Sequence, residues 1–133
     1  MDKLVFSMLD NKLFKEVRKF IFEYSKGELS PKIVYHNFKH SEEVVNAAFE
    51  IGKAEKISEQ DLEILLLAAW FHDIGFVKGF ENHEEESKKI VSKYLKKIDY
   101  SEDLIAKVCE IIELVRELNI LQTQGHIYNK LKP

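Results

Sequence analysis

The residues best suited to chemistry in this sequence are histidines and one aspartate, and they gather in two short stretches. YHNFKH covers residues 35–40, and AAWFHDIGF at residues 68–76 places His72 and Asp73 side by side after an apolar run. Neutral imidazole and carboxylate groups are ordinary ligands of Zn, Mn, Fe and similar divalent metals. These residue types therefore suggest a site for a divalent metal ion.

Hydrophobic spacing indicates that three helices direct a histidine toward the interior. In a helix predicted over residues 38–52, His40 shares one face with apolar residues at steps of four, four and three. In a helix predicted over residues 82–97, His83 also aligns with inward-facing positions. Between them, a helix predicted over residues 58–75 carries an apolar stripe that continues into the His-Asp pair.

Burial of several imidazoles together with a carboxylate is costly unless a partner satisfies them, and a divalent cation does so. The end of a helix also favours a cation, because its free carbonyl groups carry partial negative charge. The alternative is a plain helical domain, since one histidine on an apolar face is more often a hydrogen-bonded core residue. The joint occurrence of His40, His72, Asp73 and His83 near helix ends favours the metal site over that alternative.

The sequence as a whole predicts an all-α protein, a single-domain bundle of about five to six helices spanning residues 1–133. Its 5 glycines and 2 prolines are few, and helix-forming residues are abundant. Asn37 or Ser41 is expected to cap the second helix, and Ser58 the third. The tail after residue 117 is left unassigned. The predicted helices cover residues 2–25 (with a break near Asp10 and Asn11), 38–52, 58–75, 82–97 and 101–117, and residues 25–31 form a connection.

Composition excludes several classes of protein. The net charge is −3, with basic and acidic residues interspersed, so no dedicated nucleic-acid surface is expected. No apolar run reaches the roughly 18 residues of a membrane helix. Cys109 is the only cysteine, so no intrachain disulfide can form, and a reducing, cytoplasmic setting is expected.

With these motifs in place, the sequence resembles the HD superfamily of metal-dependent phosphohydrolases. The resemblance covers residues 30–120 and rests on His40, the His72-Asp73 doublet, and the flanking YHN and ENHEEES stretches, which are similar to small stand-alone bacterial HD proteins. It implies that His40, His72 and Asp73 bind a divalent metal (Mn, Mg, Zn, Fe, Co or Ni). His83 is then expected to bind a second metal or to support the first.

The resemblance also implies an activity, the hydrolysis of a small phosphate ester, with a nucleotide as the expected substrate. Asp73 is expected to act at the metal, and Glu84 to orient a water or accept its proton. The alternative for Glu84 is a residue that only favours the start of a helix. His36, Asn37 and Lys78 are expected to contact the substrate; their alternatives are an exposed turn residue, a helix cap and a solvated lysine.

One element of the family pattern has no counterpart. The last metal ligand of the family is an aspartate after the fifth helix, whereas no Asp or Glu follows Glu117 here. His126 is a weak substitute, because a short polar tail is usually solvated. The alternative function is therefore an HD domain of impaired activity that binds a nucleotide or a protein. Apolar surface left uncovered at this end would also promote a homo-oligomer.

Overall fold

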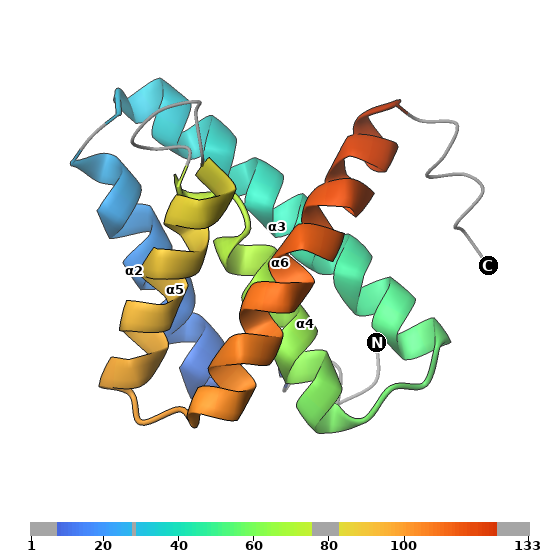
Figure 1. The fold of residues 1–133 in the computed structure, drawn as a ribbon. Coiled ribbons are helices and arrows are strands. Elements are labelled where there is room, and N and C mark those ends of the chain that lie inside the picture. The colour runs from blue at the N-terminus through green and yellow to red at the C-terminus, as the bar shows by residue number, and fades with distance from the viewer. Residues whose placement is uncertain (1–7, 28, 76–82, 125–133) are drawn as a thin grey trace.

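The computed structural model describes residues 8–27, 29–75 and 83–124, with side chains up to Val115. These residues form five α-helices and contain no strand, so the all-α prediction is confirmed (Figure 1). The helices are α2 (Lys12–Lys26), α3 (Pro31–Ala54), α4 (Glu59–Phe71), α5 (His83–Lys97) and α6 (Glu102–Gln124).

Helix α4 is the centre of the bundle, as its apolar composition predicted. It packs against α2, α3, α5 and α6 (Figure 1), and the residues from Leu66 to Phe71 are all buried. Apolar residues all around a helix require neighbours on every side, because no face can be left to water. Its end therefore lies where the other helices converge.

The predicted break in the first helical segment is confirmed. Met8 and Leu9 are helical, a turn follows at Asp10, and α2 begins at Lys12. Asn11 caps α2, since its side-chain oxygen accepts a hydrogen bond of 2.9 Å from the Phe14 amide. An asparagine cap satisfies an amide that the first turn leaves without a helical partner.

The prediction for the start of α3 was wrong. The helix begins at Pro31 with Ser30 at the N-cap position, so Asn37 and Ser41 are interior residues rather than caps. Proline suits the first position of a helix because its fixed φ is helical and its missing N–H would be unpaired there anyway. The predicted connection therefore ends at Ser30, and the YHNFKH stretch is part of one long helix.

The ends of α4 and α6 also differ from the predictions. The Ser58 hydroxyl caps α4 as expected, accepting from the Asp61 amide at 3.1 Å, but the helix ends at Phe71. The His-Asp pair therefore lies in the turn that follows, not in the last helical turn. Helix α6 continues to Gln124, seven residues past its predicted end at Glu117, through a stretch without glycine or proline.

Both α3 and α5 end in a Schellman motif in which the left-handed position is occupied by a residue other than glycine. After α3, Lys56 has φ 56°, its amide donates to the Lys53 carbonyl, and the Ile57 amide donates to the Gly52 carbonyl. Asp99 repeats this arrangement after α5, with φ 64°. The motif satisfies carbonyls that a helix end leaves free.

Among the described residues, no helix is long and apolar enough to cross a membrane.

Candidate metal centre

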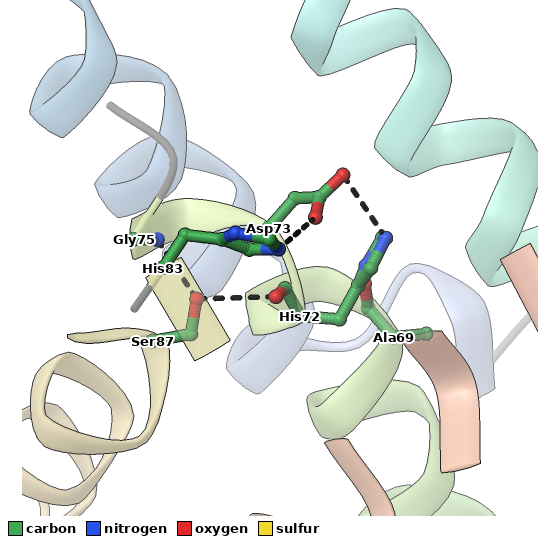
Figure 2. A network of polar contacts seen from close by, with 6 residues as sticks. All are labelled: Ala69, His72, Asp73, Gly75, His83 and Ser87. Carbon is green, nitrogen blue, oxygen red and sulfur yellow. Dashed lines mark hydrogen bonds and ion pairs between the residues drawn. The ribbon is translucent and has the colours of Figure 1, made fainter. Parts of the chain in front are cut away.

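The turn after α4 fixes the orientation of the His72 ring. His72 is only 1% exposed, and its Nδ1 lies 2.6 Å from the carbonyl oxygen of Ala69, which belongs to the last turn of α4 (Figure 2). A carbonyl oxygen can only accept a hydrogen bond, so Nδ1 carries the proton. In the neutral ring, Nε2 is then the unprotonated nitrogen, as a metal ligand requires.

Asp73 places a carboxylate oxygen in front of that lone pair. Its Oδ2 lies 3.3 Å from the Nε2 of His72 (Figure 2). Two electron-rich atoms at this distance repel each other unless positive charge lies between them. A proton on Nε2, giving an imidazolium, would supply that charge, and so would a divalent cation bound by both atoms.

His40 brings a third ligand atom from α3. One ligand atom from each of His40, His72 and Asp73 lies within 4.8 Å of the others, and no other such group was found among the described residues. Ligand atoms that share an ion, each about 2.1 Å from it, lie roughly 3–3.5 Å apart. The separation of His72 and Asp73 meets this condition, and the donor types of the three residues suit a divalent cation.

The surroundings of Asp73 favour its charged form. Burial raises the pKa of Asp73, but when the histidine rings are protonated, the hydrogen bond from His72 and the positive charge of His72, His40 and His83 lower it more. The pKa of Asp73 therefore lies below its usual value. A carboxylate that stays charged among imidazoles is suited to hold a cation.

His83 approaches the same carboxylate from α5. Its Nε2 lies 4.0 Å from the Oδ1 of Asp73, on the opposite side from His72 (Figure 2). The structure thus brings together all four residues that were expected at a metal site. His83 is not part of the compact three-residue group. Its position suits one of two roles, either to support the Asp73 carboxylate or to bind a second ion.

Ser87 and Gly75 hold the start of α5 against the turn. The buried Ser87 hydroxyl accepts from the Gly75 amide at 2.8 Å and donates to the His72 carbonyl at 3.1 Å (Figure 2). A Cβ on Gly75 would lie only 2.0 Å from the His83 carbonyl oxygen. Sequence reasoning missed both roles; the only available signal was that Ser87 shares a helix face with His83.

A cavity of about 150 Å³ lies beside the cluster. His40 and Asp73 line it, and so does Asn37, one of the residues expected to contact substrate. Ser41 and Trp70 also line it. The cavity therefore begins at the candidate metal centre and extends along the face of α3 that carries the YHNFKH motif.

The other expected site residues lie elsewhere. His36 is exposed on α3 and is not among the residues that line the cavity. Glu84 lies in the first turn of α5, where its carboxylate forms an ion pair with Lys88 at 3.6 Å. Lys78 and His126 lie outside the described residues.

Comparison with known protein families identifies a match. A family model described as the HD domain matches residues 37–129, which include the three donors and the whole of α4, α5 and α6. No curated protein and no solved structure shows significant similarity to the chain.

Proposed function

Because this chain belongs to the HD-domain family, whose members are in general metal-dependent phosphohydrolases, we propose that it hydrolyses a phosphate ester with a divalent metal ion. The observation that carries the proposal is the convergence of His40, His72 and Asp73 within 4.8 Å. These donors come from α3 and from the turn after α4. Three protein ligands leave positions open for water and substrate, as in catalytic metal sites.

The residues of the chain have separable tasks in this mechanism. A bound divalent cation would supply a water of lowered pKa and offset the charge on the phosphoryl oxygens. The Ala69 carbonyl fixes the His72 ring with Nε2 toward the site. His83 faces the second oxygen of Asp73 and so holds the carboxylate in place. Burial of His72 keeps water away from that side.

Glu84 is our candidate for the group that accepts a proton from the attacking water. It follows His83 directly on the first turn of α5 and is partly buried. Its ion pair with Lys88 gives the carboxylate a fixed position but also a competing partner. To accept a proton, the Glu84 carboxylate must therefore turn from Lys88 toward the attacking water.

The proposed substrate is a small phosphorylated molecule, with nucleotides as the first class to test. Asn37 lines the cavity beside the cluster and can contact it. His36 and Lys78 are proposed as outer contacts from the sequence alone.

A single cysteine suits a reducing compartment such as the cytoplasm. Homo-oligomer formation stays a prediction that analytical ultracentrifugation can check.

A second candidate function has one observation in its favour. Among the described residues the group that could hold a metal has three members, and the further aspartate that the family resemblance implies is not one of them. A site with one ligand fewer would bind metal and phosphate yet turn over slowly. The protein would then serve as a nucleotide- or protein-binding module.

Metal content and turnover of the purified protein test both functions. We expect bound metal, measured by mass spectrometry, and release of phosphate from a nucleotide panel supplied with Mn, Mg, Co, Zn, Fe or Ni. His72→Ala and Asp73→Ala should each lower both by at least about 100-fold, because each removes a donor. His36→Ala, which changes an exposed histidine of α3, is the matched control for metal content.

The outcomes separate the possibilities. Metal binding without turnover would favour the binding module. Turnover that survives both His72→Ala and Asp73→Ala would show that the chemistry takes place elsewhere.

A further inference from the structure

Ser41 is a buried hydroxyl for which the structure gives no protein partner. It is 6% exposed, lies on α3 directly after His40, and lines the cavity beside the metal centre. Among the described residues, nothing donates to or accepts from its hydroxyl. Ser25, the other buried serine of this cavity, instead donates to the Ile21 carbonyl at 3.0 Å. A buried polar group without a partner costs stability, so such a group at a site calls for a ligand.

The chemistry of the cavity wall narrows the kind of ligand. Away from His40 and Asp73, the polar lining consists of Ser41, Asn37 and Ser25, and the apolar side includes the rings of Phe38 and Trp70. The described residues that line it include no Lys or Arg. Hydroxyl and amide groups facing an apolar ring suit an uncharged group that carries hydroxyls, whereas a phosphate would meet no cation here except at the metal centre.

The position of the cavity shows which part of a phosphate ester would occupy it. His40 and Asp73 belong to both the cavity and the cluster, so a group in the cavity lies next to the ligand of the metal centre. With the phosphoryl group of an ester at the metal, the adjoining part of the substrate is the alcohol that leaves. A volume of about 150 Å³ is well below the roughly 300–1,000 Å³ of pockets that enclose a drug-sized ligand. It holds a group the size of one sugar ring, and the rest of a larger substrate would lie outside.

We propose that this cavity binds a pentose-sized, uncharged polyol as the alcohol part of the substrate, and that Ser41 is the residue that recognises one of its hydroxyls. The inference rests on the proposed phosphohydrolase function and adds to it the class of leaving group. Ser41 can both donate and accept, so it can pair with a hydroxyl in either orientation. A site built around such a pair discriminates against an analogue without the hydroxyl, because the serine is then left unpaired.

Trp70 provides a direct readout of the cavity. It is the only tryptophan in the chain and lines the cavity, so its fluorescence reports occupancy of this site. The test titrates ribose 5-phosphate, phenyl phosphate and inorganic phosphate into the Mg-supplied protein while Trp70 emission is followed. The same two esters are compared as substrates by their kcat/KM values.

We expect ribose 5-phosphate to bind more tightly than phenyl phosphate and inorganic phosphate. Ser41→Ala should reduce the preference for ribose 5-phosphate over phenyl phosphate by about tenfold, in binding and in kcat/KM. This variant removes only one oxygen, and alanine is a good helix former. Ser92→Ala on α5, whose hydroxyl lies 3.4 Å from Cys109 Sγ, is the matched control and should leave the preference unchanged.

The result that overturns the inference is an equal preference in the wild type and Ser41→Ala, or no preference for the sugar ester in the wild type. Failure of the proposed function gives a different result. In that case neither ester is hydrolysed, while the fluorescence titrations still show whether Ser41 selects the polyol.

Discussion

At the scale of single residues, the candidate site depends on atoms that are not ligands. The Ala69 carbonyl selects the tautomer of His72, and Ser87 ties the backbone at His72 and Gly75 to α5. Gly75 is required because its backbone lies against α5 with no room for a side chain. Such supporting groups commonly change metal affinity by 10–100-fold when they are lost.

Gly75→Ala should damage both the fold and the site. The new Cβ would meet the Ser87 amide nitrogen at 2.7 Å in addition to the His83 carbonyl oxygen, and backbone atoms cannot move aside cheaply. We expect the free energy of unfolding to fall by about 2 kcal/mol, measured in urea, and metal affinity to fall at least tenfold by calorimetry.

Gly27→Ala is the control for this change. Nothing lies within 4 Å of a Cβ at Gly27, and its φ of −77° suits alanine. Its stability should stay the same or rise by up to about 1 kcal/mol. Equal behaviour of the two alanine variants would contradict the close contact between the turn and α5.

At the scale of elements, the helix ends show where local geometry costs stability. Lys56 and Asp99 adopt left-handed backbone conformations that glycine tolerates better than other residues. Their hydrogen bonds nevertheless complete the ends of α3 and α5. The connection between α5 and α6 is also fixed to α4, because the Tyr100 hydroxyl donates to the Glu63 carboxylate.

Lys56→Gly should stabilise the protein. Glycine removes the steric cost of φ 56° while keeping both hydrogen bonds of the motif, so we expect a gain of about 1 kcal/mol in thermal or urea unfolding. Lys53→Gly, three residues earlier and inside α3, should instead lose about 1 kcal/mol. A loss of stability in both variants would show that the end of α3 is not strained.

Tyr100→Phe should reveal the link between α4 and the connection before α6. Burial, together with the hydrogen bond and negative charge of Glu63, raises the pKa of Tyr100 well above its usual value. The folded protein therefore keeps the phenol protonated, and this contribution to stability is complete below about pH 10 and is lost as the pH rises further.

We expect Tyr100→Phe to lower the free energy of unfolding by about 1 kcal/mol at neutral pH. The difference from the wild type should shrink above about pH 10, where the unfolded wild type gains stability by ionising its tyrosine. Urea unfolding at a series of pH values measures both effects. A difference that grows with pH would contradict the assigned hydrogen bond.

At the scale of the whole molecule, a bound ion would join α3 to the turn after α4. Because the unfolded chain does not present this donor set, metal at 100 times its dissociation constant should stabilise the fold by about 2.7 kcal/mol. That gain corresponds to a rise in Tm on the order of 10 °C, which differential scanning fluorimetry measures and a chelator should reverse. The shift should persist in His36→Ala and vanish in His72→Ala; a shift of equal size in both variants would place the ion elsewhere.

Much of this architecture was predictable from the sequence because it depends on local periodicity. The inward position of His40 follows from its spacing to Val44 and Ala48, and it holds even though α3 begins seven residues earlier than predicted. The sequence pattern predicts Pro31 in a connection, although proline also suits the first position of a helix. It also predicts Gly75 as the end of a helix, whereas the constraint on this glycine is contact with a segment twelve residues away.

The parts that escaped prediction depend on long-range contacts. That Ser87 bridges two backbone groups, or that Ser41 has no partner among the described residues, follows only from how helices pack. A sequence pattern specifies which face of a helix is buried, but not which atoms meet across it.

All three candidate donors lie between residues 40 and 73, on one helical hairpin made of α3 and the end of α4. The chelating unit is therefore compact along the chain, with a single connection to close before the donors can meet. Helix α6 contributes to the core that supports this hairpin without supplying any of the three donors. Transfer of the unit to another pair of crossing helices would therefore also require a replacement for Ser87, which holds the turn from α5.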